Sequence, residues 1–283
     1  MKKTATYYAE QYNARAAIPE HPAIFARWIQ QSAWVRRSNA GMYDLMYGES
    51  AGERLDIFPT RQPHAPLIVF IHGGWWRSLD KSDFSMLAPA FTNAGFNLAL
   101  TNYTLAPEVS IEEIVKQQLR ALAWLYKNSE KYDIDHRRII VIGHSAGAHL
   151  AAMMMAASWP TYDEELPLDL IKAGVLLSGV YDLEPILQAD FVNIDLQLTP
   201  PRIEPLSPAL MPRAQKIPFI TSVGGKESDE FKYQTQTMAK AWTLNHQQHI
   251  DVPECNHLTI CDALADTESA LFKATIALAK SIK

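Results

Sequence analysis

The stretch VIGHSAGAH (residues 141–149) decides the fold of this chain. An apolar run ends at Gly143, and an alanine-rich run begins directly after Ser145. A strand that turns sharply into a helix crowds the backbone against the side chain at its apex, so the flanking residues must be nearly featureless, as Gly143, Ala146 and Gly147 are. The stretch therefore predicts a strand, a tight turn with Ser145 at its apex, and a helix.

This turn leaves two interpretations of Ser145. A strand-to-helix turn lifts the serine hydroxyl above the carboxyl edge of the sheet, where open α/β folds bind ligands, and this makes Ser145 a candidate nucleophile. Alternatively, the hydroxyl only caps the N-terminus of the following helix. The five-letter pattern Gly-x-Ser-x-Gly is common by chance, so the choice depends on the rest of the chain.

Short apolar strands alternate with helices along most of the sequence. The predicted strands are residues 42–47, 54–58, 67–71, 96–102, 138–143, 173–179, 219–225 and 249–252. The first two flank the turn GESAGE and are expected to pair antiparallel. The predicted helices are residues 83–94, 111–128, 145–157, 230–244 and 259–280. Such alternation is typical of a mostly parallel sheet with helices on both faces, so we expect an α/β, doubly wound fold with eight strands.

Two segments break this rhythm. Residues 5–38 carry aromatic and apolar side chains at helical spacing, interrupted by Pro19 and Pro22, and predict two short helices. Residues 182–218 contain seven prolines and no sustained periodicity. Because so long a connection is uncommon in a compact domain, we expect residues 1–40 and 182–218 to form a small cap within a single domain that spans the whole chain.

Composition excludes several classes of function. The 283 residues carry a formal net charge of −5 without a lysine or arginine block, which argues against nucleic acid as a partner. The apolar runs are too short for a membrane span or a secretion signal, so we expect a cytoplasmic protein that does not bind membranes. Cys255 and Cys261 form neither a disulfide framework nor a zinc site, and we expect no metal and no cofactor. Composition does not decide whether the chain forms a homodimer.

The stretch FIHGGWW (residues 70–76) supplies the first evidence for catalysis. A tetrahedral oxyanion needs preorganised N–H donors, and glycines allow the backbone to turn its amides toward it. We predict that the amides of Gly73 and Gly74, together with that of Ala146, form an oxyanion hole, as in esterases with an HGGG-type loop. The alternative is that His72 and the two glycines form only a tight turn.

A general base is expected after Ser145, because the order in this architecture is serine, acid, histidine. His149 lies one turn into the helix after Ser145 and is expected to pack there. His246 is expected to end a helix and His249 to begin a strand. His257 lies in the loop PECNHLT between the last strand and the last helix, so we predict that it is the base.

The acid is expected in GGKESDEF (residues 224–231), directly after the strand at 219–225. We favour Glu227, which stands just beyond the strand, because Asp229 has the position of an N-terminal residue of the next helix. Asp229 remains the alternative acid. A glutamate can orient the imidazole and stabilise its charged form as an aspartate does.

Taken together, these motifs resemble the α/β-hydrolase superfamily and, within it, the hormone-sensitive-lipase-like branch, in which HGG, NYTLAPE (residues 102–108) and GHSAG occur in this order. A closer resemblance, over roughly residues 40–270, is to the kynurenine formamidase (arylformamidase) subgroup. It is carried by HGGWW with LDKSDFS, by GHSAGAHLAAMMMAASWP, and by SGVYDLEPI. The vertebrate members have aspartate where Glu227 stands.

The resemblance implies an α/β-hydrolase fold and the hydrolysis of N-formylkynurenine to kynurenine and formate, a reaction on a small formyl or acyl substrate. It implies a Ser145, His257 and Glu227 triad. Aromatic side chains are candidates to wall the cleft around the leaving group, with core packing as the alternative. The substrate carboxylate needs a partner, although solvated surface is the better explanation for any single arginine of the cap. The aromatic candidates are Trp75, Trp76 and Tyr103, and the arginine candidates are Arg36, Arg37, Arg202 and Arg213.

Two rival functions remain. The first keeps the mechanism and changes the substrate, giving a carboxylesterase or thioesterase that acts on small acyl esters. The second is a hydrolase fold that binds a ligand without catalysis, against which the complete order of serine, acid and histidine argues.

Overall fold

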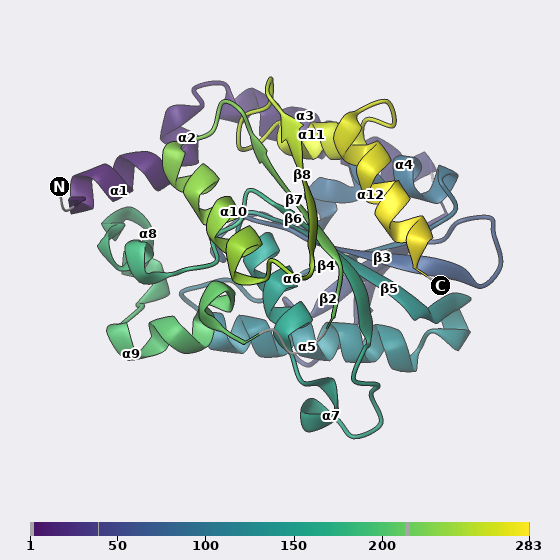
Figure 1. Cartoon of the computed structure of the whole chain (residues 1–283). Helices are drawn as coiled ribbons and strands as arrows, with labels where there is room; N and C mark the ends of the chain where they lie inside the picture. The colour runs from purple at the N-terminus through teal and green to yellow at the C-terminus, as the bar shows by residue number, and fades with distance from the viewer. Residues whose placement is uncertain (1–2, 39, 213–215, 283) are drawn as a thin grey trace.

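The computed structural model describes residues 3–38, 40–212 and 216–282 (Figure 1). Within these residues one sheet has the strand order β1-β2-β4-β3-β5-β6-β7-β8. β2 pairs antiparallel with β1 and β4, and the other neighbours pair parallel. The bounds are β1 (Met42–Met46), β2 (Arg54–Phe58), β3 (Ala65–Ile71), β4 (Asn97–Thr101), β5 (Ile134–His144), β6 (Ile171–Leu177), β7 (Phe219–Gly224) and β8 (His246–Val252). The predicted eight-stranded α/β sheet is confirmed.

Helices cover both faces of this sheet (Figure 1). On one face lie α5 (Ile111–Lys127), α6 (Ala146–Ala156) and α10 (Asp229–Ala241), and on the other α3 (His21–Ser38), α4 (Ala88–Asn93), α11 (Ile260–Ala265) and α12 (Ala270–Ser281). Successive residues of β3 point to opposite faces, so Leu67 and Val69 join the first core while Ile68 and Phe70 join the second. Burial on both faces explains why the central strands are continuous apolar runs.

The amino-terminal segment contains three helices, where two were predicted. They are α1 (Ala5–Tyr12), α2 (Ala14–Ala17) and the long α3. Pro22 does not interrupt a helix, because it lies in the first turn of α3, where the missing N–H has no intrahelical acceptor to lose. The prolines therefore separate α2 from α3 and leave α3 whole.

The carboxy-terminal part also departs from the prediction. The single helix expected over residues 259–280 is divided into α11 and α12, and the Ser269 side chain caps α12 by accepting from the Phe272 amide. α10 ends at Ala241, so the prediction that His246 ends a helix is wrong, and His246 begins β8. Residues 81–93 form a 3₁₀ helix, η1 (Lys81–Leu87), followed by α4.

The two predicted cap segments lie side by side. The segment at 182–218 includes η3 (Glu184–Gln188), α8 (Asp190–Leu196), α9 (Pro200–Ile203), η4 (Glu204–Leu206) and η5 (Pro208–Leu210). α1 contacts α8, η3 and α10, and Figure 1 shows α1 and α8 together at one side of the molecule. Their assignment as a cap within one domain stays an interpretation. Across the described residues, no helix has the length and apolar content that a membrane span requires.

Candidate active site

Ser145 stands at the apex of a sharp turn between β5 and α6. Its backbone has φ 56° and ψ −121°, an unfavourable region for a residue with a side chain. A Cβ at Gly143 would lie 2.1 Å from the Gly147 carbonyl oxygen, and one at Gly147 would lie 2.0 Å from the Ile71 carbonyl oxygen. Only glycine fits either position, and the predicted strand, turn and helix are confirmed.

The Ser145 hydroxyl faces a histidine. Its Oγ lies 2.9 Å from Nε2 of His257, and both residues are buried. The Ser145 side chain makes no capping hydrogen bond to α6, so the interpretation of this serine as merely a helix cap is wrong. The loop after β8 thus brings His257 to the serine, as the sequence predicted.

A carboxylate completes this chain of hydrogen bonds. His257 Nδ1 lies 2.6 Å from Glu227 Oε2, and Glu227 is only 7% exposed. Asp229, the alternative acid, is exposed in the first turn of α10. The structure therefore brings Ser145, His257 and Glu227 together and leaves Asp229 outside the group. Their catalytic roles stay predictions.

The second oxygen of Glu227 is held by two donors. Oε1 accepts from the Gly224 amide at 2.6 Å and from the Ser178 hydroxyl at 2.5 Å. Ser178 follows β6, the neighbour of β7, and has a φ of 50°. The sequence analysis missed Ser178, whose only signal was its place at the carboxyl end of a predicted strand.

A second histidine, His144, holds the loop of His257. Its Nε2 donates to the His257 backbone carbonyl at 2.7 Å, and its ring centroid lies 4.9 Å from that of His257. Burial lowers the pKa of His144 to about 3, and His257 acts in the same direction. His144 is therefore neutral near pH 7 and donates through Nε2. Nothing in the sequence indicates this role of His144.

Residues 72–76, here named the oxyanion loop, pass directly beside the serine. A Cβ at Gly73 would lie 2.9 Å from Cβ of Ser145, and Gly74 has a φ of +102°. The Gly73 and Gly74 amides meet no hydrogen-bond acceptor within the described part of the chain. The Ala146 amide is the first of α6 and has no intrahelical acceptor. These amides have the freedom that the predicted oxyanion hole needs.

Four aromatic side chains from separate elements, here named the aromatic wall, pack around Trp75, and one of them, Phe231, lies against His257. They are Tyr12 of α1, Trp75 of the oxyanion loop, Phe191 of α8 and Phe231 of α10. The centroid of Trp75 lies 5.9 Å from Tyr12, 6.1 Å from Phe191 and 6.3 Å from Phe231, and Phe231 lies 4.1 Å from His257. Trp75 was predicted, and the other three were missed because nothing in the sequence shows that α1, α8 and α10 meet.

The other two predicted wall residues lie in the core. Trp76 is completely buried and packs edge-on against His149, with centroids 5.0 Å apart. Tyr103 is 1% exposed and stacks on His72, with centroids 4.4 Å apart. Trp76 also lies 5.9 Å from Trp75, and Tyr12 and Phe231 of the aromatic wall are as deeply buried, so contact of Trp76 and Tyr103 with substrate stays a prediction.

The predicted arginines are placed away from this site or are already paired. Arg36 pairs with Asp56, and Arg202 forms two hydrogen bonds with Glu112 that help to lower the pKa of this carboxyl to about 2. Arg37 is exposed on α3. The fourth candidate, Arg213, lies outside the described residues.

Arg15, which has no signal in the sequence, is linked to the oxyanion loop through Ser78. Its Nη2 donates to Ser78 Oγ at 2.8 Å, and Ser78 Oγ donates to the Gly74 carbonyl at 2.9 Å. Over residues 3–38, 40–212 and 216–282, no carboxylate pairs with Arg15. This guanidinium is therefore available to an anion beside the loop.

Comparison with known proteins gives relatives of similar size. The family model BD-FAE matches residues 55–172. Kynurenine formamidase of Danio rerio is 31% identical over 241 residues, which cover 82% of this chain and 80% of that protein. A proposed thioesterase from Silicibacter sp. TM1040 superposes with a TM-score of 0.83 at 31% identity, covering 96% of this chain and 98% of the other.

Esterase B from Lactobacillus rhamnosis superposes with a TM-score of 0.69 at 17% identity, over 95% of this chain and 97% of that one, a likeness that concerns the fold. The match to the Danio rerio protein, at 31% identity over 82% of this chain, shows the family as well as the fold. The chain is a hydrolase that belongs to the kynurenine formamidase family of α/β-hydrolases.

Proposed function

We propose that this hydrolase cleaves an N-formyl arylamide, with N-formylkynurenine as the substrate and kynurenine and formate as the products. The observation that carries the proposal is the chain of hydrogen bonds from Ser145 through His257 to Glu227, set against the aromatic wall. The name of the Danio rerio relative supports the same substrate.

In the first half of the reaction, Ser145 Oγ attacks the formyl carbon while its proton passes to Nε2 of His257. The carbonyl π electrons move to oxygen, and the oxyanion accepts hydrogen bonds from the amides of Gly73, Gly74 and Ala146. Glu227 keeps the imidazole in the right tautomer and stabilises its positive charge. Its own orientation is held by Ser178 and Gly224.

The intermediate then collapses. His257 gives its proton to the arylamine nitrogen as the C–N bond breaks, which leaves a formyl ester on Ser145. Water attacks this ester, His257 takes the proton of the water and returns one to Ser145 Oγ, and formate departs. The formyl group is the smallest acyl group, so the oxyanion loop can lie close against the serine, as Gly73 does.

The aromatic wall suits an aromatic leaving group. Aromatic pairs contribute about 0.5–1.5 kcal/mol beyond the area that they bury. Phe231 is packed against the ring that must protonate the leaving nitrogen, and Trp75 extends the wall from the oxyanion loop. An aniline nitrogen that departs toward His257 thus keeps its ring among aromatic neighbours.

Arg15 is the residue that we propose for the carboxylate of the amino-acid substrate. It is linked to the oxyanion loop through Ser78 and has no carboxylate partner among the residues that the structure describes. Guanidinium groups bind carboxylates through two parallel N–H donors, and such charge-assisted bonds are stronger than neutral ones.

The test is hydrolysis of N-formylkynurenine, formanilide, p-nitrophenyl acetate and an acyl thioester by the wild-type enzyme. We expect the highest kcat/KM for N-formylkynurenine. A preference for the ester or the thioester by orders of magnitude would overturn the formamidase proposal.

The Arg15→Gln variant tests the carboxylate site. It should raise KM for N-formylkynurenine about tenfold, the effect expected for one lost charge-assisted contact, and leave KM for formanilide, which has no carboxylate, unchanged. Arg37→Gln, an exposed arginine on α3, is the matched control and should change neither value.

The second candidate function is hydrolysis of small esters or thioesters. It is favoured by the 31% identity with the proposed thioesterase from Silicibacter sp. TM1040. The same residues would perform the same steps with an alcohol or a thiol as the leaving group. A cytoplasmic location and a homodimer also stay proposals, and gel filtration with light scattering would determine the oligomeric state.

A further inference from the structure

We propose that Tyr103 and His72 are positioning residues that aim the Gly73 and Gly74 amides at the oxyanion. The inference rests on the proposed function only in its use of Ser145 as the nucleophile, and it holds for a formamidase and for an esterase alike. It also gives Tyr103 a role other than the substrate contact expected from the sequence.

Tyr103 anchors two successive peptide units of the oxyanion loop. Its hydroxyl lies 3.0 Å from the His72 carbonyl oxygen and 3.3 Å from that of Gly73, and it donates to this pair. In a trans peptide the C=O and N–H bonds point in opposite directions. With the His72 and Gly73 carbonyls turned toward Tyr103, the Gly73 and Gly74 amides point away from it.

The sheet order places the serine on that opposite side. The oxyanion loop follows β3, Tyr103 follows β4, and Ser145 follows β5, and β3 lies between the other two. Carbonyls that face Tyr103 therefore turn their amides toward Ser145. Successive N–H groups on one side of the backbone form an anion-binding concavity, which is the geometry that an oxyanion requires.

His72 supports the same arrangement from within the loop. Its ring is fully buried and stacks on Tyr103, and Nδ1 lies 2.8 Å from the Gly73 carbonyl oxygen, to which it donates when that nitrogen is protonated. This contact holds the peptide that carries the Gly74 amide. Tyr103 and His72 together thus hold the two peptides that carry the Gly73 and Gly74 amides.

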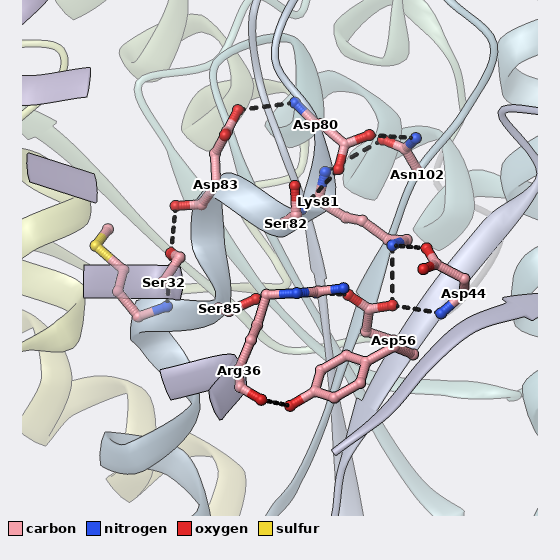
Figure 2. Close-up of polar contacts among 12 residues, drawn as sticks. Ser32, Arg36, Asp44, Asp56, Asp80, Lys81, Ser82, Asp83, Ser85 and Asn102 are labelled. Carbon is pink, nitrogen blue, oxygen red and sulfur yellow. Dashed lines mark hydrogen bonds and ion pairs between the residues drawn. The ribbon is translucent and has the colours of Figure 1, made fainter. Parts of the chain in front are cut away.

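Asn102 holds the other edge of the imidazole. Its Oδ1 lies 3.0 Å from Nε2 of His72 and accepts from the Lys81 amide at 3.2 Å, while its Nδ2 donates to Asp80 at 2.9 Å. Figure 2 shows Asn102 beside Asp80 and Lys81. Both neighbours fix the amide orientation, because a flipped Asn102 would set its NH₂ against the Lys81 amide.

The Lys81 side chain connects Asn102 and its partners to β1 and β2, at one edge of the sheet. Its buried ammonium lies 2.6 Å from Asp44 and 2.9 Å from the fully buried Asp56, which also pairs with Arg36 (Figure 2). Lys81 and Asp56 are buried and paired, which holds them in one arrangement, while Asp44 lies exposed at the end of the network. Asn102, and through it His72, is therefore attached to rigid structure.

The hydroxyl of Tyr103 is a more constant hydrogen-bond donor to the oxyanion loop than the ring of His72. Two carbonyl oxygens face the two nitrogens of His72, and a neutral ring has a proton for only one of them. Burial lowers the pKa of His72, and the Gly73 carbonyl and the charge of Asp80 oppose this shift. Burial raises the pKa of Tyr103, so its hydroxyl keeps its proton at any pH of assay.

The experiment compares Tyr103→Phe with wild type. The variant keeps the ring stack and removes the donor. We expect kcat to fall about 10- to 100-fold on both formanilide and p-nitrophenyl acetate, less than for the loss of an oxyanion donor itself, with KM within about twofold. Affinity for a trifluoromethyl ketone, which forms a tetrahedral oxyanion on Ser145, should fall by the same factor as kcat.

Tyr43→Phe is the matched control, because its hydroxyl also donates to a backbone carbonyl at 3.0 Å, that of Arg36, at the edge of the sheet distant from β5. It should leave kcat and ketone affinity unchanged. A Tyr103→Phe enzyme with wild-type kcat, or one that loses ketone affinity no more than Tyr43→Phe does, overturns the proposal.

A second pair of variants reports on His72. Asn places an amide donor near the position of Nδ1, so His72→Asn should retain at least tenfold more kcat than His72→Val. Equal kcat in the two variants contradicts the role of His72. The ester reports on the loop even if formanilide is not turned over, so failure of the substrate assignment and failure of this inference are separate results.

Discussion

The hydroxyl of Ser178 lies 2.5 Å from Oε1 of Glu227, the carboxylate oxygen that does not face His257. With the Gly224 amide it satisfies that oxygen, so Oε2 remains directed at the imidazole. The orientation of the acid therefore depends on a residue that follows a different strand.

Removal of this support should slow catalysis without abolishing it. Ser178→Ala is expected to lower kcat about tenfold, since charged hydrogen bonds contribute about 1.5–3 kcal/mol and Gly224 still holds Oε1. The measurement is steady-state kcat with formanilide. Ser222→Ala, which removes a buried hydroxyl bound to the Ile250 carbonyl, is the control and should retain the wild-type rate.

Glu227 and Asp229 should respond very differently to substitution. Glu227→Gln leaves the shape intact but permits the wrong imidazole tautomer, and we expect kcat to fall about 10⁴-fold. Asp229→Asn, at an exposed helix terminus, should stay within about twofold of wild type. The reverse order of losses in one assay would assign the acid to Asp229.

Ser145→Ala removes the predicted nucleophile. The loss in kcat should approach 10⁶-fold, because residues that act as one unit lose nearly all of their contribution together. A fluorophosphonate probe should label wild type and leave this variant unlabelled. Labelling of Ser145→Ala to the wild-type extent would place the nucleophile elsewhere.

Acid stability should depend on His149. Its Nε2 donates to the Leu206 carbonyl at 2.7 Å, and burial lowers its pKa to about 4, whereas the unfolded chain has the ordinary value near 6.5. The unfolded state binds the proton first, so the stabilising contribution is complete above pH 6.5 and is lost as the pH falls toward 4.

Between pH 7 and pH 5, His149 should lower the free energy of unfolding by about 2 kcal/mol. His149→Gln keeps a donor for Leu206 and cannot titrate, so its unfolding free energy should fall less over this interval by that amount. Urea unfolding at the two pH values measures the difference. Equal slopes in wild type and variant would contradict this prediction.

The strands, the sharp turn at Ser145 and the grouping of Ser145, His257 and Glu227 could be predicted from the sequence because each has a local signal. Ser145 lies between glycines that the packing requires, and His257 lies in a loop at the right place in the chain order. Glu227 could be preferred over Asp229 because helix capping explains the latter. Each of these signals comes from residues close together in the sequence, and backbone geometry fixes how such residues lie in the structure.

The supporting residues could not be predicted because their partners are distant in the chain. Ser178 meets Glu227 only because β6 and β7 are adjacent, and Arg15 meets Ser78, 63 residues later in the chain, only through the tertiary fold. Tyr103 was expected in the wall since an aromatic ring after a strand fits either a cleft or the core. Only the tertiary structure shows that the Tyr103 ring stacks on His72.

The aromatic wall and the group of Ser145, His257 and Glu227 come from different parts of the fold. The sheet and its loops supply Ser145, Glu227 and His257, whereas three of the four wall residues come from α1, α8 and α10. Substitutions in α1 and α8 can therefore change the aromatic wall and leave the hydrogen bonds among Ser145, His257 and Glu227 in place. The leaving group that fits beside Ser145 can thus change while the hydrogen bond from Ser145 to His257 stays the same.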